Sequence, residues 1–206
     1  MVEGIRGAEL ELMLQRERVA ELRRSLPPGP EMPDYRFHQG PTDLHVDGPL
    51  TTVGLHELVG DRPLVLYHFM YGGAQVEPCP MCAMWADGWD GVAPHLERTI
   101  DFAVVAAAPI DEWRAFARGR GWQRLRLLSA FGSSFKIHVG GEDAEGHQLP
   151  FVSVYHRTGG KVRLSYSGGA HIHGEHWRGV DLLSPVWHLL DLTRPGRGDW
   201  TPSLGY

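Results

Sequence analysis

The pattern of apolar and polar positions predicts alternating strands and helices in the middle of the chain. Residues 63–71 (PLVLYHFMY) are apolar almost throughout, which is typical of a strand that is buried on both faces. Residues 101–107 repeat this pattern, and residues 125–130 give a third, shorter strand. Between them, residues 82–96 and 110–120 favour helices, although two glycines and a proline make the first of these imperfect.

The C-terminal part of the chain predicts a β-hairpin and a closing helix. Residues 151–157 (FVSVYHR) and 161–166 (KVRLSY) are β-rich runs on either side of a Thr-Gly-Gly turn, and so short a connection favours a hairpin. Residues 180–192 are expected to form the last helix. This order of elements indicates an α/β sandwich with a mixed β-sheet flanked by helices.

The N-terminal segment has a helical pattern of its own. Residues 10–26 carry a partly apolar stripe among charged side chains, and prolines end the pattern before residue 31. We expect a docking or dimerising arm at residues 1–30. Residues 31–62 contain many prolines and glycines, so we expect them to be irregular apart from a short helical turn at 55–59. The predicted organisation is therefore an arm at 1–30 and one domain at 31–206.

Composition narrows the classes of function. A chain of 206 residues suits one domain with an appendage, and the net charge of -5 argues against nucleic acid or an anionic membrane as a partner. No apolar run approaches the roughly 20 residues that span a bilayer. Charged residues interrupt the N-terminus where a secretory signal would be apolar. We therefore expect a cytoplasmic protein without membrane or nucleic-acid partners.

The candidate chemistry centres on two cysteines, Cys79 and Cys82, which form a CPMC motif. A lone CxxC in a cytosolic protein points to redox chemistry or to half of a metal site. The motif opens a predicted helix, where unpaired N–H groups and the helix dipole favour a thiolate and so lower the pKa of Cys79. Cys82, one turn further on, can then resolve a mixed disulfide. A structural zinc site would need a second pair of ligands, and the sequence contains no second CxxC.

Longer motifs surround the cysteines and extend along the chain. They are YHFMYG at 67–72, CPMCAMWADGWDG at 79–91, GW at 121–122, SAFGSSF at 129–135 and LLDLTRPGRGDW at 189–200. With these motifs, nearly the whole chain resembles the thioredoxin-like family catalogued as domain of unknown function 899. The resemblance implies a thioredoxin-like fold and a thiol–disulfide activity without a defined substrate. It also implies that Cys79 is the nucleophile and Cys82 the resolving thiol.

A thioredoxin fold also places a proline, usually cis, before a strand that faces the CxxC. Pro150 directly precedes the predicted 151–157 strand and is the best candidate for this position. Trp85, Asp87 and Trp89 follow the family pattern. Pro78, Met81 and Ala83 depart from the residues usual at their positions.

Three histidines, His171, His173 and His176, lie within six residues of one another. Imidazoles at this spacing suit copper, zinc or iron, either alone with an open coordination position or together with Cys79 and Cys82. The alternative is that they are solvated loop side chains. His68, in a buried strand, is expected to be structural, although Tyr67 and His68 could both lie at the edge of the site.

These observations support three hypotheses. The first is a thiol–disulfide oxidoreductase that acts on a disulfide-containing protein or a small disulfide and requires no cofactor. The alternative is a metal-dependent enzyme or copper-handling protein that uses the cysteines and the histidine cluster. The third is a binding module without catalysis. The arm and the C-terminal tryptophans also make a homodimer plausible.

Overall fold

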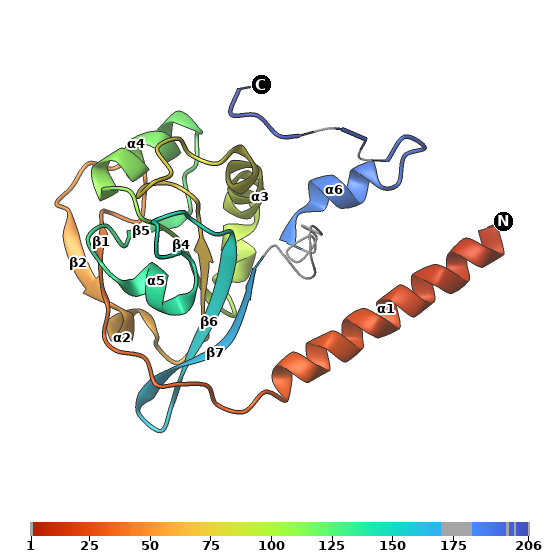
Figure 1. The fold of residues 1–206 in the computed structure, drawn as a ribbon, viewed down its shortest axis with the longest axis horizontal. Helices are drawn as coiled ribbons and strands as arrows, with labels where there is room; N and C mark the ends of the chain where they lie inside the picture. Colours follow the sequence, from red (N-terminus) through yellow and green to blue (C-terminus); the bar gives the residue numbers. More distant parts are fainter. Residues whose placement is uncertain (1, 170–182, 197, 200, 206) are drawn as a thin grey trace.

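The computed structural model describes residues 2–169, 183–196, 198–199 and 201–205. Its centre is a mixed seven-stranded sheet in the order β2-β1-β5-β4-β3-β6-β7 (Figure 1). Strands β3, β4 and β5 are parallel, and the remaining pairs are antiparallel. The strands are β1 (Arg36–Gln39), β2 (Thr51–Gly54), β3 (Leu64–His68), β4 (Asp101–Ala106), β5 (Arg126–Ser129), β6 (Phe151–Thr158) and β7 (Lys161–Gly169).

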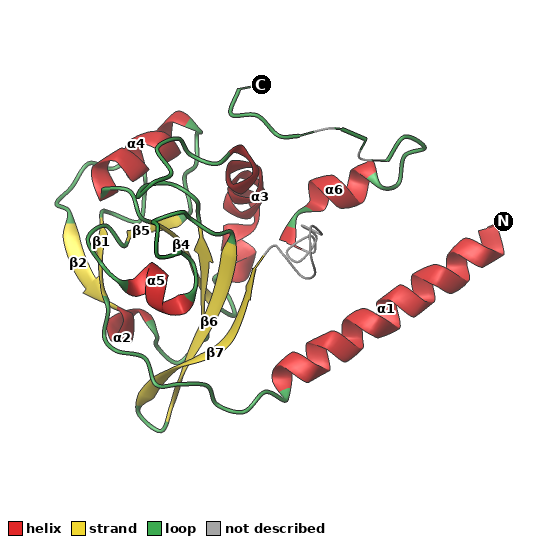
Figure 2. Ribbon diagram, in the orientation of Figure 1, coloured by secondary structure: helices red, strands yellow, loops and turns green. Residues whose placement is uncertain are grey.

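Helices cover both faces of the sheet (Figure 2). Helices α3, α4 and α6 pack on one face, and the short helices α2 and α5 pack on the other. Helix α1 precedes the sheet and extends away from it (Figure 1). The helices are α1 (Val2–Arg24), α2 (Leu55–Leu58), α3 (Pro80–Leu96), α4 (Ile110–Gly119), α5 (Phe135–Val139) and α6 (Pro185–Leu190).

The central strands are apolar on both faces because each face has its own core. Successive side chains of a strand point to opposite sides, so Val104 of β4 joins the core under α3 and α4 while Val105 joins the core under α2 and α5. In β3, Tyr67 likewise joins the core under α3 and α4, and Leu66 joins the core under α2 and α5. The nearly unbroken apolar runs that predicted these strands reflect this double burial.

The predicted α/β sandwich with a mixed sheet is confirmed, including the hairpin between β6 and β7. Gly159 and Gly160 form its turn with φ values of 60° and 77°, which residues with a Cβ rarely adopt. The predicted last helix is present in the described residues as α6, and the short turn at 55–59 is present as α2.

The expectation that residues 31–62 are irregular is wrong, because this segment contributes β1 and β2. Each of these strands is only four residues long, so the alternation of apolar and polar residues is too short to recognise. Phe37 and Val53 supply their buried side chains, and the two residues are register partners. The pairing of His38 with Ser129 attaches β1 to the central sheet.

Helix α1 has 23 residues, but charged side chains run along it. No helix in the described part of the chain is both long and apolar enough to cross a membrane.

Candidate functional site

The two cysteines lie where the loop after β3 ends and α3 begins, as the sequence predicts. Pro80 is the first residue of α3, a position that suits its fixed φ, and Cys79 is the N-cap. The Cys79 Sγ accepts a hydrogen bond from the backbone N–H of Cys82 at 3.5 Å. The backbone N–H of Cys79 donates to the Met70 carbonyl at 3.1 Å, which ties this loop to the end of β3.

This position lowers the pKa of Cys79 to about 7. The largest cause is a hydrogen bond from the Cys82 thiol, and the backbone N–H groups of Cys82 and Met81 add to it. Burial of Cys79 opposes these effects, because it disfavours the charged form. Cys79 is only partly buried, so its sulfur combines thiolate character near neutral pH with access from solvent.

Cys82 has the opposite properties. Its side chain is fully buried, and burial together with the neighbouring Cys79 raises its pKa well above the ordinary value. The Tyr67 hydroxyl donates a hydrogen bond to the Cys82 Sγ at 3.0 Å. Burial and the nearby cysteines raise the pKa of Tyr67 well above 10, so this hydroxyl keeps its proton. The motif therefore holds one reactive and one protected sulfur.

Aromatic rings fix the position of the Tyr67 hydroxyl. The Tyr67 ring lies edge-on to Trp85 and Trp89, with centroid distances of 5.6 and 4.6 Å, and Trp187 of α6 packs against Trp85. Such edge-to-face pairs are favourable because the positive edge of one ring meets the negative face of another. The tryptophans of the cysteine motif thus hold a hydrogen-bond donor against the buried sulfur.

His68 lies on the opposite face of the sheet from Tyr67, because neighbouring residues of a strand point to opposite sides. Its Nε2 is 2.8 Å from the Ser153 Oγ, and its ring stacks on Phe135. Burial lowers its pKa well below 6.5, so the imidazole is neutral. The structural role expected for His68 is confirmed, and of the two neighbours Tyr67 is the one that contacts a cysteine, Cys82.

Sequence reasoning missed Lys136, a fully buried lysine of α5. Its Nζ donates to the Phe69 carbonyl at 3.0 Å, one residue beyond the end of β3. Burial lowers its pKa to about 7, while the negative charges of Cys82 and Glu142 oppose the shift. A cation placed here favours the thiolate of Cys82. The lysine directly follows the SAFGSSF motif, but a short helix gives no periodicity that would reveal its burial.

The other motif residues near the cysteines brace α3. Asp87 accepts hydrogen bonds from the Trp122 indole at 2.7 Å and from Arg120 at 2.5 Å. Asp90, one turn further along, accepts from three consecutive backbone N–H groups at Gln123, Arg124 and Leu125. These bonds fasten α3 to the segment before β5 and give the GW motif a structural explanation.

Pro150 directly precedes β6, and the pairing of His68 with Phe151 places it at the end of β3 from which the cysteine loop leaves. Every peptide bond of the described residues is trans, so the expectation of a cis bond at Pro150 is wrong. Its contribution to catalysis stays a prediction.

His171, His173 and His176 lie outside the described residues, so the metal hypothesis stays a prediction. Within the described ranges, one group of three possible ligands converges, namely Asp143, Glu145 and His147 in the loop before β6. This group is largely exposed and includes neither cysteine.

Comparisons with known proteins agree with this architecture. Residues 6–204 match the model of a family described as bacterial protein of unknown function (DUF899). Similar solved structures include an antioxidant protein (1-Cys peroxiredoxin) from Plasmodium falciparum, with 14% identity and a TM-score of 0.56, covering 82% of this chain and 100% of that one. Mycobacterium tuberculosis AhpC has 16% identity and a TM-score of 0.53, covering 77% of this chain and 89% of that one.

At these identities the likeness establishes the fold alone. No curated protein matches the chain. The match over almost all of the sequence and the observed topology together show that this chain belongs to the DUF899 family and has the thioredoxin-like fold.

Proposed function

We propose that this protein is a thiol–disulfide oxidoreductase in which Cys79 is the nucleophile and Cys82 the resolving thiol. One observation carries the proposal: two cysteines one turn apart have opposite environments. Cys79 is accessible with its pKa lowered to about 7, whereas Cys82 is buried with its pKa raised. A dithiol that exchanges with disulfides needs this division between an attacking and a reserve sulfur. The proposed substrate is a disulfide-containing protein or a small disulfide, and the reaction requires no cofactor.

In the first step, the Cys79 thiolate attacks one sulfur of the substrate disulfide. The substrate S–S bond breaks, and the departing thiolate takes a proton from water. The product is a mixed disulfide between Cys79 and the other half of the substrate. This bond removes the Cys79 charge, which is one of the causes that raise the pKa of Cys82.

In the second step, Cys82 gives its proton to water and its thiolate attacks the Cys79 sulfur. The Cys79–Cys82 disulfide forms, and the second substrate half leaves as a thiolate, so two electrons pass from the protein to the substrate. The Tyr67 hydroxyl donates a hydrogen bond that stabilises the Cys82 thiolate, and the buried Lys136 ammonium favours the same charge. External thiol then reduces the protein for another cycle.

The test uses the fact that the chain contains only two cysteines. The reduced wild type is mixed with the aromatic disulfide DTNB, and the release of thionitrobenzoate is followed by absorbance. We expect two equivalents per chain, one for each step. Cys82→Ser should release one equivalent and retain the second as a mixed disulfide, detectable by mass spectrometry. Cys79→Ser should react more than about 100-fold more slowly.

A second measurement tests the cause of the reactivity. In the reduced wild type, the Cys82 thiol still donates to Cys79, while Cys82 itself is buried with a raised pKa. The rate of iodoacetamide alkylation should therefore reach half its maximum below the pH of about 8.5 that is ordinary for a thiol. An alkylation midpoint at 8.5, or rapid DTNB reaction in Cys79→Ser, would contradict the proposal.

Peroxide is a second candidate substrate, because the similar solved structures include peroxiredoxins. The Cys79 thiolate would attack one peroxide oxygen, break the O–O bond and become a sulfenic acid, while the other oxygen leaves as water or an alcohol. Cys82 would then form the same disulfide and release water. Rapid oxidation of the reduced dithiol by hydrogen peroxide would favour this reaction, and slow oxidation with rapid DTNB exchange would favour the first.

A further inference from the structure

Helix α1 carries a heptad pattern along one face. Apolar or small residues recur at alternating steps of three and four, and a glutamine occupies one of these positions. This spacing keeps side chains on a single stripe that faces a partner helix in a coiled coil. The positions are Ile5, Ala8, Leu12, Gln15, Val19 and Leu22.

The stripe has no partner among the described residues. Ile5, Leu12 and Leu22 are each more than half exposed, at 56, 51 and 58%. An open groove lies between α1 and α6, and Leu12 and Val19 line its α1 side. Leu189, 62% exposed, lines the opposite side. Contiguous apolar surface of this kind marks an interaction site.

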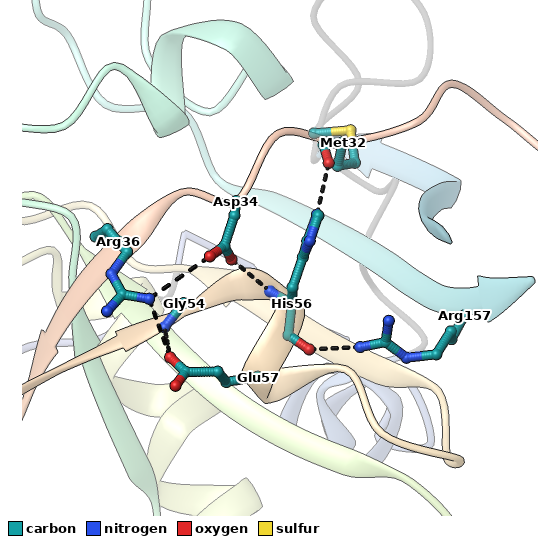
Figure 3. A network of polar contacts seen from close by, with 7 residues as sticks. All are labelled: Met32, Asp34, Arg36, Gly54, His56, Glu57 and Arg157. Atoms are coloured by element: carbon teal, nitrogen blue, oxygen red, sulfur yellow. Dashed lines mark hydrogen bonds and ion pairs between the residues drawn. The ribbon is translucent and has the colours of Figure 1, made fainter. Parts of the chain in front are cut away.

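The segment that follows α1 is attached to the domain at residues 30–34, so α1 leaves the domain from this point. Met32 and Pro30 share backbone hydrogen bonds with β7. A polar network continues this attachment (Figure 3): His56 contacts the Met32 carbonyl at 2.8 Å, and Asp34 accepts from the His56 backbone N–H at 2.8 Å. Arg157 of β6 donates to the His56 carbonyl.

The charges on α1 favour a second copy of the same helix in the antiparallel direction. Residues 2–12 contain three acidic and one basic side chain, whereas residues 13–24 contain four basic and two acidic ones. Antiparallel pairing places each acidic half against the basic half of the other helix. We propose that the occupant of this stripe is α1 of a second copy of this chain, related by a two-fold axis.

One register satisfies both the apolar and the charged positions. When Ile5 lies opposite Leu22 of the second copy, Ala8 lies opposite Val19 and Leu12 opposite Gln15. Each of these pairs joins two core positions of the heptad, and two-fold symmetry repeats each of them.

The same register pairs opposite charges beside the apolar stripe. Glu9 faces Arg16 of the second copy, and Glu11 faces Arg18 of the second copy. Symmetry repeats both contacts, which gives four attractive pairs. A parallel pair would retain Glu11 opposite Arg16 but would place Arg18 opposite Arg23, so it would have two attractive and two repulsive contacts. The antiparallel arrangement is therefore favoured.

The test is the mass of the full-length chain in solution, measured by analytical ultracentrifugation at micromolar concentration. We expect twice the 23.0 kDa of one chain. The charge variants E9R/E11R and R16E/R18E should each dimerise at least about tenfold more weakly, because each turns four attractive pairs into repulsive ones. An equal mixture of the two variants should recover the dimer, since every pair is again opposite in charge.

Disulfide cross-linking tests the direction in a Cys79→Ser/Cys82→Ser background. Ile5→Cys chains mixed with Leu22→Cys chains should cross-link, whereas Ile5→Cys chains alone should not. A monomeric wild type, failure of the mixture to recover the dimer, or cross-linking of Ile5→Cys with itself would overturn the proposal. Circular dichroism of each variant checks that the exposed substitutions leave the fold intact.

Discussion

Helices α3 and α1 both carry apolar side chains, but the surroundings of these side chains are opposite. Trp85 of α3 is 1% exposed and packs between Tyr67 and Trp187, whereas Leu12 of α1 is about half exposed. Burial against the sheet fixes α3 and with it the two cysteines. Helix α1 has no such partner among the described residues, so its stripe contributes little to the stability of the domain. Helix α3 supports the site because its apolar face is buried against the sheet.

The largest expected effect comes from the buried side of this comparison. Trp85→Ala removes a fully buried ring and leaves a cavity beside Tyr67, so the free energy of unfolding should fall by about 3–5 kcal/mol. Urea unfolding followed by circular dichroism measures this change. A loss below about 1 kcal/mol would mean that the aromatic wall does not hold α3 in place.

Lys136→Met should change how stability depends on pH. The pKa of Lys136 is about 7 in the folded chain and near 10.5 in the unfolded chain, so above pH 7 the unfolded state binds more protons. As the pH rises from 7 to 10, the titration of Lys136 therefore increases the free energy of unfolding of the wild type by up to about 1.4 kcal/mol per pH unit. The Lys136→Met variant lacks this gain. Its free energy of unfolding should therefore compare most favourably with that of the wild type near pH 6, and this advantage should shrink as the pH rises.

The measurement is urea unfolding of the wild type and the variant at several pH values. Lys161→Met is the matched control, because Lys161 is half exposed and its partner Glu31 titrates far below this range. The groups that interact electrostatically with Lys136 are Cys82, Glu142 and His68. Parallel stability curves for the wild type and Lys136→Met would contradict a depressed pKa.

Tyr67→Phe tests the contact between the aromatic wall and the buried sulfur. The variant loses the hydrogen bond to the Cys82 Sγ, so the second release of thionitrobenzoate should slow about tenfold. The first release, which depends on Cys79, should keep its rate. Tyr71→Phe, whose ring packs against Trp113 and Phe116, is the control with unchanged rates. Equal slowing of both releases would indicate a general loss of packing.

The smallest effect is expected on α1 away from its stripe. Leu10 is 54% exposed and lies outside the heptad positions, so Leu10→Ala should change the free energy of unfolding by less than about 0.5 kcal/mol. It should also leave the mass in solution unchanged. A larger loss of stability would show that the face of α1 that carries Leu10 packs on the domain of the same chain.

Several features of the molecule were predictable from local pattern. In the sequence, β3 and β4, which are buried on both faces, are continuous apolar runs. The Gly159-Gly160 pair predicts the hairpin between β6 and β7. The position of Cys79 at the start of α3 follows from a strand, a loop and a helix in succession. Each of these features depends on residues close together in the chain, which is why the sequence reveals them.

Other features depend on contacts between distant segments. Strands β1 and β2 are too short to show periodicity, and their pairing with β5 gives them a place in the sheet. The burial of Lys136 and the contact of Tyr67 with Cys82 arise only when α5, β3 and α3 pack together.

The sequence by itself therefore determined the fold class, the family and the cysteine pair at a helix N-terminus. It also carries the heptad and charge pattern of α1, because helical periodicity is local. The tertiary structure alone decided which cysteine is accessible and which is buried. The hydrogen bond from the Cys82 thiol lowers the pKa of Cys79, and burial raises that of Cys82. The tertiary structure also left the stripe of α1 exposed, because no other described element of the chain covers it.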